Sequence, residues 1–269
     1  MSRQYFLEIG QPQRTRFIAR RQSYHGNTLG ALAVGGNVWR REPYKEILMD
    51  VPYISPCYTY RDKDTGESEI EYGERIANEL EAKILEVGEN TVAAFIAETI
   101  GGATAGAITP VPGYFKKIRK ICDKYGIILI LDEVMCGMGR TGSLFASEQE
   151  GITPDLVVIA KGLGAGYQPI GAVLVSEKIF TAFREGSKVF LHGHTYMGHP
   201  VACAAAYAVQ RKIKEQDLLS SVSSLSRNLF CQLREVFANH PYVGDIRGRG
   251  LFIGMELVSN RETKEPFKS

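Results

Sequence analysis

The amino-acid sequence predicts an α/β fold, and two observations carry this prediction. First, short apolar runs typical of strands alternate with longer amphipathic stretches typical of helices. Second, three of the runs end abruptly at charged side chains: TVAAFIAE (91–98), IILILDEV (127–134), and LVVIA (156–160) before Lys161. With 269 residues, the chain can bury a sizeable core in one large domain or two modest ones.

Strand and helix predictions alternate through the first half of the chain. RFIARR (16–21) predicts a strand that leads into the glycine-bearing turn SYHGNT. A charged helix is expected around 73–87. The segment 112–126 predicts a second helix, because Pro112 opens it and Gly126 closes it, the usual asymmetry of helix ends.

The second half changes character after about residue 199. IGAVLVS (170–176) predicts one more strand, and the pattern then becomes helical. The tail DIRGRGLFIGMELV (245–258) alternates like strands around glycines. We expect this tail to begin a second, smaller domain that the chain does not complete.

The composition is that of an ordinary soluble enzyme and excludes several classes of partner. The formal net charge is +2, from 32 basic and 30 acidic side chains, so nucleic acid and anionic membranes are not expected partners. No apolar run approaches the roughly 18 to 20 residues of a membrane span. Five scattered cysteines without a CxxC pair indicate free thiols in a reducing compartment. We expect a cytoplasmic location, with a mitochondrial one left open.

Glu98, Asp132 and Lys161 are the candidate site residues, because each follows an apolar strand. In open α/β sheets, ligands bind beyond the carboxyl ends of the strands, where such side chains converge. A single charged residue after a strand usually belongs to a solvated loop, whereas three of them favour a site. Their combination does not by itself name a reaction.

Lys161 has the most specific chemistry of the three. It lies between LVVIA and the glycine-rich GLGAGY, and partial burial of an amine there favours the neutral form that attacks an aldehyde. Asp132 precedes it by 29 positions (161 − 132), about one strand–helix–strand unit. If the site holds a pyridine ring, a carboxylate paired with the ring nitrogen would keep that ring electron-withdrawing. The alternative from spacing alone is an Asp132–Lys161 salt bridge at the edge of the sheet.

Two other sites are conceivable and are less well supported. GLGAGYQ could begin a dinucleotide site, but YQPIGAVLV follows it with a proline and a strand instead of the required helix. His192, His194 and His199 cluster in LHGHTYMGHP without the spacing of a helical metal site. We therefore expect neither a nicotinamide-dependent dehydrogenase nor a metal.

Several separate blocks resemble the class III (omega-type) aminotransferases in sequence and in order. The central block is ILILDEVMCGMGRTG…FASEQEGITPDLVVIAKGLGAGYQPIGAVLVSEKI; SYHGNTLGAL, IAETIGGATAGAITPVPGYFKKIRKICDKYG, HGHTYMGHPVACAAA and IRGRGLFIGMEL complete the pattern. The resemblance implies the fold type I of pyridoxal-phosphate-dependent transferases, with a mixed, mostly parallel sheet. It further implies a cofactor-binding large domain at 1–215 and an incomplete C-terminal small domain at 216–269.

The resemblance also implies roles for individual residues. Lys161 would form a Schiff base with pyridoxal 5'-phosphate and shuttle a proton, and Asp132 would pair with the pyridinium nitrogen. Val134 would pack on one ring face and Tyr24 would stack on the other. Glu98 would support the acidic side of the site. Thr195, in HGHTY, would reach the cofactor phosphate of the neighbouring subunit, which implies a homodimer.

The implied reaction moves an amino group from an amine or amino acid to a 2-oxo acid. Family members carry a phosphate-binding serine-glycine-serine turn before the point where this chain starts, and a carboxylate-binding arginine in a longer small domain. We therefore expect a chain truncated at both ends, and the alternative function is that of an impaired homologue that dimerises or binds the cofactor weakly. Ala103 and Met135 replace a glutamate and a glutamine, which argues against ornithine or GABA aminotransferases.

Overall fold

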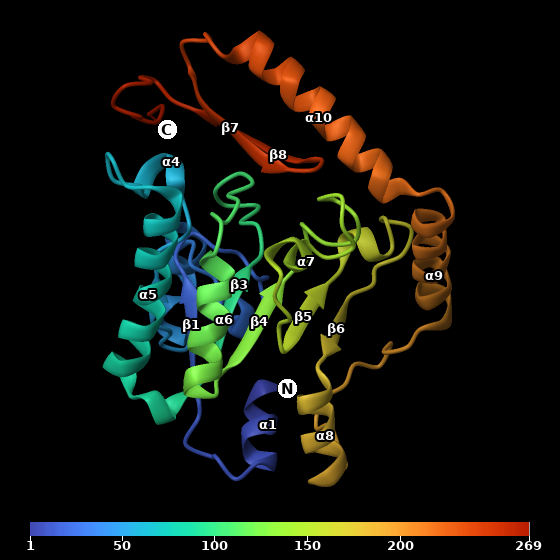
Figure 1. Ribbon diagram of the computed structural model, residues 1–269. Helices are drawn as coiled ribbons and strands as arrows, with labels where there is room; N and C mark the ends of the chain where they lie inside the picture. The colour runs from blue at the N-terminus through green and yellow to red at the C-terminus, as the bar shows by residue number, and fades with distance from the viewer. Residues whose placement is uncertain (269) are drawn as a thin grey trace.

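A computed structural model describes residues 1–268 and shows a central six-stranded sheet (Figure 1). The strand order is β2-β1-β3-β4-β5-β6, and every neighbouring pair is parallel except β5 and β6, which are antiparallel. The predicted mixed, mostly parallel sheet is confirmed. The strands are β1 (Arg16–Arg20), β2 (Tyr53–Ile54), β3 (Val92–Glu98), β4 (Ile128–Asp132), β5 (Leu156–Ile159) and β6 (Ala172–Val175).

Helices cover both faces of this sheet. The α-helices are α1 (Ser2–Glu8), α2 (Leu29–Val34), α3 (Val38–Arg41), α4 (Thr59–Asp62), α5 (Glu69–Val87), α6 (Tyr114–Tyr125), α7 (Ala146–Glu150), α8 (Glu177–Glu185), α9 (Pro200–Glu215) and α10 (Leu218–Phe237). Three short 3-10 helices complete the list: η1 (Glu42–Ile47), η2 (Glu89–Thr91) and η3 (Lys161–Leu163).

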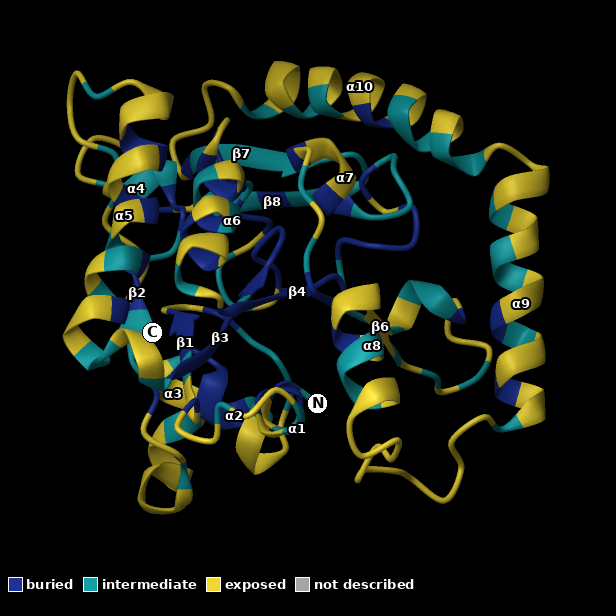
Figure 2. Ribbon diagram, turned by 60° about the horizontal axis from the view of Figure 1, so that its bottom comes forward, coloured by how far each residue is buried: buried dark blue, intermediate teal, exposed yellow. Residues whose placement is uncertain are grey.

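The alternation of side chains along β3 and β4 divides the core into two layers. Phe95, Leu129 and Leu131 pack with α5 and α6 on one face, whereas Ile128 and Ile130 pack with α1 and α8 on the other. Figure 2 shows the resulting band of buried residues through β1, β3 and β4. Near-continuous apolar strands are therefore required, which is why β3 and β4 are apolar up to their last residues.

Local signals at the helix ends explain where the main helices begin and end. The predicted helix at 73–87 begins earlier, at Glu69, because Ser68 and Glu71 form a capping box. The predicted helix at 112–126 is α6, which ends at Gly126 with a φ of 60°. The predicted strand at 127–134 ends at Asp132, two residues earlier than expected, because Glu133 is bonded to the helix that follows.

The last part of the chain lies beside the carboxyl edge of the main sheet (Figure 1). Helix α10 is followed by β7 (Val243–Arg249) and β8 (Phe252–Leu257), which pair only with each other in an antiparallel hairpin. Of the five thiols, Cys57, Cys122 and Cys136 are buried and the other two are exposed. Within residues 1–268, none of the helices combines the length and the apolar character that crossing a bilayer requires.

Candidate functional site

Glu98 and Asp132 occupy equivalent positions at the carboxyl ends of β3 and β4. The two residues are direct partners in the parallel register, and both side chains are buried. They have the same parity along their strands as Ile96 and Ile130, so both carboxylates lie on the same side of the sheet. The sequence prediction that strand ends bring these acids together is thus realised in the structure.

The Asp132 carboxylate is held from two sides. His25 Nδ1 lies 2.8 Å from Asp132 Oδ2, and the Val134 N–H donates to Oδ1 at 2.9 Å. The His25 side chain is only 2% exposed, and its other ring nitrogen, Nε2, has no hydrogen-bond partner within residues 1–268. The aspartate is therefore fixed in orientation and partly shielded from water. His25 was not predicted from sequence; its place beside Tyr24 in SYHG was the only available signal.

A tight turn after β1 places Tyr24 and His25 at this edge. Ser23 Oγ donates to the Arg20 carbonyl at 2.8 Å and accepts from the Gly36 N–H at 3.0 Å. A Cβ on Gly36 would lie 2.0 Å from the Arg20 carbonyl oxygen, so the two backbone segments can approach only because residue 36 is glycine. The turn is consequently fixed by backbone contacts and does not depend on the site's own side chains.

Glu98 connects the turn to the loop that follows β3. Its carboxylate accepts from the Gly102 N–H at 3.0 Å and from the Tyr24 N–H at 3.4 Å. Burial raises the pKa of Glu98 above its usual value, while His25 and the Gly102 N–H oppose that rise. The ring of Tyr24 has the Arg40 guanidinium 4.7 Å from its centre.

Lys161 begins η3, two residues after β5 ends at Ile159, and it is exposed, whereas partial burial was expected from the sequence. Asp132 pairs in register with Val158, so Lys161 lies three residues further along the chain and beyond the same sheet edge. Its φ of 41° is unusual for a residue with a side chain and represents local backbone strain, of order 1–3 kcal/mol. Such strain, when it occurs at a candidate lysine, supports a functional hypothesis for that residue.

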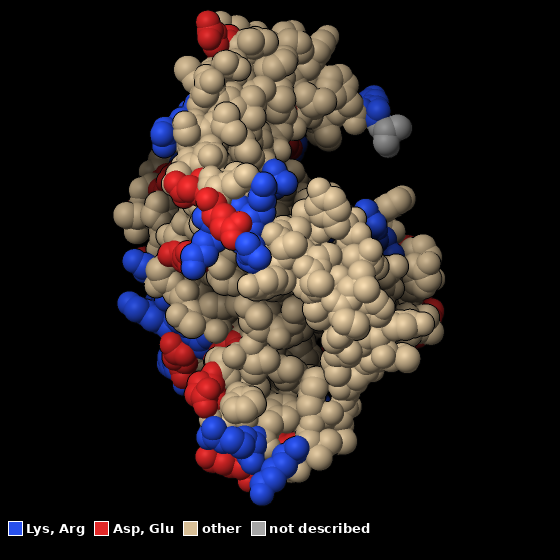
Figure 3. Space-filling model, turned by 90° about the vertical axis from the view of Figure 1, so that its right-hand side faces the viewer, with Lys and Arg blue, Asp and Glu red and all other residues tan. Residues whose placement is uncertain are grey.

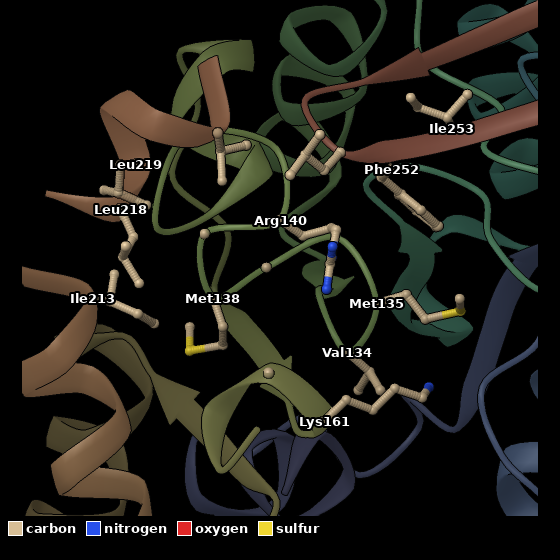
Figure 4. A pocket seen from close by; sticks show the side chains of 15 residues that line it. Val134, Met135, Met138, Arg140, Lys161, Ile213, Leu218, Leu219, Phe252 and Ile253 are labelled. Carbon is tan, nitrogen blue, oxygen red and sulfur yellow. The ribbon is translucent and has the colours of Figure 1, made fainter. Parts of the chain in front are cut away.

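Lys161 and Val134 line a cavity of about 450 Å³ (Figure 4). In this view the Lys161 stem runs beside Val134, and its nitrogen points away from Met138 and Ile213. The lining is otherwise largely apolar, with Arg140 projecting into the middle of it. Asp132 forms a hydrogen bond with His25, and within residues 1–268 no salt bridge joins Asp132 to Lys161. The simple salt-bridge alternative is therefore not what the structure shows.

Glu133, the second acid of the pair after β4, has a different environment. It is fully buried and accepts hydrogen bonds from Thr99 Oγ1 at 2.8 Å, Ala146 N at 2.7 Å and Ser147 N at 2.8 Å, with a weaker one from Cys136 Sγ at 3.6 Å. Two of these donors are the free N–H groups at the start of α7, which favour a negative charge. Glu133 thus fixes the segment after β4 and does not face the candidate site.

Thr195 lies in the exposed loop between α8 and α9. Its hydroxyl makes no recorded hydrogen bond within residues 1–268, so the structure of one chain does not bring it to Asp132 or Lys161. Nearby, His199 Nδ1 accepts from the Ala202 N–H and caps α9. Across the described part of the chain, no three His, Cys, Asp or Glu side chains form a cluster suited to a metal ion.

The arrangement fits a nitrogen heterocycle that carries an aldehyde. A buried carboxylate with both oxygens oriented can still accept from a protonated ring nitrogen, because each oxygen has two lone pairs. Beyond the end of the neighbouring strand, Lys161 carries an amine, and Val134 lines the same cavity as Lys161. Pyridoxal phosphate has this combination of a ring nitrogen and an aldehyde.

Comparison with known proteins shows similarity to class III aminotransferases, which are a class of pyridoxal-phosphate enzymes. Residues 1–268 match the family model of class-III aminotransferases. The chain is 52% identical to an aminotransferase of Gibberella zeae over 99% of its length and 53% of the relative. It is 42% identical to a putrescine–pyruvate aminotransferase of Pseudomonas aeruginosa, over 99% of this chain and 58% of the other. An amine transaminase from an uncultivated Pseudomonas species, solved in its PLP-bound form, superposes with a TM-score of 0.95 at 37% identity, covering 99% of this chain and 61% of that one.

The fold is therefore that of the pyridoxal-phosphate-dependent transferases of fold type I. More specifically, the chain belongs to the class III aminotransferase family, whose members use pyridoxal phosphate. The predicted family is confirmed. The chain spans about half the length of the curated relatives it matches.

Proposed function

We propose that this protein is a pyridoxal-phosphate-dependent aminotransferase that moves an amino group from an amine or amino acid to a 2-oxo acid. The observation that carries the proposal is the Asp132 carboxylate, oriented by His25 and the Val134 N–H, one strand away from Lys161. Family membership supports the same reaction class. Because the chain spans about half of its relatives, the activity is proposed for the protein and does not follow from membership alone.

When bound, pyridoxal phosphate supplies an aldehyde that captures amino groups and a ring that withdraws electrons from the bond to be broken. In this proposal, Lys161 holds the aldehyde carbon and later moves a proton between the substrate Cα and the cofactor C4′. Asp132 stabilises the proton on the ring nitrogen, and His25 stabilises the charge on Asp132. Val134 and Tyr24 restrict the ring from its two faces, and Glu98 keeps Tyr24 in place through its N–H.

We also propose a homodimer in which Thr195 reaches the cofactor phosphate of the neighbouring subunit. The support is the surface around Thr195, where large apolar side chains are exposed in the single chain. Figure 3 shows few charged residues over much of this face. Members of the exposed set are Phe180, Val189, Phe190, Leu191, Tyr196, Met197 and Val201.

The proposed division into domains is a large domain at 1–215 and the start of a small domain at 216–269. It is supported by the separate β7–β8 sheet and by the end of the main sheet at β6. Alanine at 103 and methionine at 135 favour donors other than ornithine or GABA, and a simple amine with pyruvate is a reasonable first pair to assay. Three buried free thiols favour the cytoplasm.

The test is spectroscopic. Adding pyridoxal phosphate to the purified chain is expected to produce a visible absorption band of lysine-bound cofactor, and Lys161→Ala is expected to abolish it. Lys178→Ala, at an exposed lysine of α8, is the matched control and should keep the band. A folded chain that shows no band at saturating cofactor would contradict the proposal and favour an impaired homologue. If the band forms, turnover of an amine with pyruvate distinguishes an active enzyme from a protein that only binds the cofactor.

A further inference from the structure

We infer that Phe252, the first residue of β8, is a positioning residue that fixes the Val134–Met135 segment under the candidate site. The effect of Phe252 on cofactor binding rests on the proposed function. Its effect on the Val134–Met135 backbone rests only on contacts within the chain. Phe252 thus gives the β7–β8 hairpin a role in the site, although none of the hairpin's residues was predicted to contribute to it.

The hairpin is anchored to the loop after β3 through backbone contacts. Arg247 Nε donates to the Gly106 carbonyl at 2.8 Å, and its guanidinium also donates to the Ala105 carbonyl. A Cβ on Gly254 would lie 2.3 Å from the Gly106 carbonyl oxygen, so β8 rests directly on the loop's backbone. These contacts leave the hairpin little freedom to shift relative to the end of β3.

A second set of contacts anchors the hairpin to the loop after β4. The Leu251 N–H donates to the Arg140 carbonyl at 2.9 Å, and a Cβ on Gly250 would lie 2.5 Å from Thr141 Cα. Arg249 also forms a 2.7 Å ion pair with Glu150, which is mostly buried. The turn of the hairpin is therefore fixed against the loop that begins with Val134.

Phe252 lies between these two anchors and points toward Met135 (Figure 4). A Cβ on Gly102 would lie 2.7 Å from Met135 Sδ, 3.2 Å from Phe252 Cζ and 3.4 Å from Glu98 Oε1. The thioether, the aromatic ring and the buried carboxylate thus converge on one glycine. Phe252 also packs on a small core cluster made of Ile100, Cys136 and Ala146.

The consequence for the site follows from chain connectivity. Met135 is the neighbour of Val134, whose N–H orients Asp132 and whose side chain lines the Lys161 cavity. The segment makes its next backbone bond at Gly137, which donates to the Glu133 carbonyl at 2.9 Å. Between these two bonds, Phe252 packs on the cluster that contains Cys136, and its ring and the Met135 thioether both lie beside Gly102, so we infer that the ring limits movement of this backbone.

Hydrogen exchange of the cofactor-free chain tests the structural content. Phe252→Ala is expected to speed exchange of the protected amides of Val134 and Gly137 by about 10-fold or more, because local opening becomes easier. Met255→Ala, a truncation of similar size on the opposite face of β8, is the control and should leave these amides unchanged. Equal exchange of this segment in the two variants would overturn the inference, whether or not the chain binds cofactor.

Cofactor affinity tests the catalytic meaning. Phe252→Ala is expected to raise the Kd for pyridoxal phosphate by about 10-fold, and Phe252→Leu should restore most of the affinity. If Phe252 acts through Met135, the double variant Phe252→Ala with Met135→Ala has a Kd for pyridoxal phosphate no higher than that of the single variant with the higher Kd. Fully additive losses would overturn the assigned route. A wild-type chain that binds no pyridoxal phosphate would instead contradict the proposed function, while the exchange experiment would still decide the role of Phe252.

Discussion

His25 and Asp132, 107 positions apart in the chain, form a buried pair with 2.8 Å between Nδ1 and Oδ2. The histidine comes from the turn after β1 and the aspartate from the end of β4, with β3 between the two strands. The pair therefore exists only when the sheet is assembled. The orientation of the Asp132 carboxylate therefore depends on the fold as a whole.

Replacing His25 should weaken cofactor binding. His25→Ala removes one of two groups that orient Asp132, and a hydrogen bond to a charged group contributes about 1.5–3 kcal/mol. We expect the Kd for pyridoxal phosphate to rise by roughly 10- to 100-fold, as measured by titration of the visible band. His240→Ala, at an exposed histidine, should leave the Kd unchanged.

Glu133 and Asp132 should differ in how much each contributes to the free energy of unfolding. Glu133→Gln places an amide N–H₂ against backbone N–H donors in a fully buried position, and should lower the free energy of unfolding by about 2–4 kcal/mol. Asp132→Asn should cost about 1 kcal/mol or less without cofactor, because His25 can change tautomer and accept from the new amide. Urea denaturation of the cofactor-free variants measures both; similar losses at the two positions would contradict this division.

Glu98 should make stability depend on pH in a defined direction. Since burial raises its pKa, the folded chain keeps this proton at pH values where the unfolded chain has lost it. The contribution of Glu98 to stability therefore falls as the pH rises above the ordinary glutamate pKa of about 4.3. Relative to Glu98→Gln, the wild-type chain should lose stability as the pH increases through this range. Denaturation midpoints that run parallel with pH in the two proteins would argue against a raised pKa.

Two glycines near the turn after β1 should respond in opposite ways to alanine. Gly36→Ala places a methyl group 2.0 Å from the Arg20 carbonyl oxygen, and overpacking of this kind costs about 1–3 kcal/mol or more. Gly30→Ala, in α2 with no atom within 4 Å of the new Cβ, should stabilise by up to about 1 kcal/mol through helix propensity. Thermal melts of both variants check the contrast, and a stabilised Gly36→Ala protein would show that the turn is looser than its contacts indicate.

Much of the fold could be predicted because its signals are local. The apolar runs ending at Glu98, Asp132 and before Lys161 are strands that terminate at one edge. Helix α6 ends at Gly126 as predicted, but it begins at Tyr114, two residues after Pro112, with Gly113 as its N-cap. Parallel register then brings Glu98 and Asp132 together without any further information in the sequence. The resemblance to a family supplied the chemistry, which strand ends alone do not provide.

The parts that escaped prediction depend on contacts between distant segments. Nothing local distinguishes His25 from a solvated histidine, because its partner is 107 residues away. Asp132 and Glu133 are adjacent in sequence, yet only the start of α7 makes the second one structural. Phe252 reads as one apolar residue in an alternating strand, and its packing on Ile100, Cys136 and Ala146 depends on how the hairpin lies on two loops.

The order of the elements along the chain has a consequence for biosynthesis. All six strands of the main sheet, with His25, Glu98, Asp132 and Lys161, lie before residue 176, because β6 ends at Val175. Domains fold from the N-terminus as the ribosome extends the chain, at about 5–20 residues per second. The charged edge can therefore assemble on the nascent chain while α9, α10 and the hairpin are still being translated. The hairpin that carries Phe252 then docks after them, onto loops that are already in place.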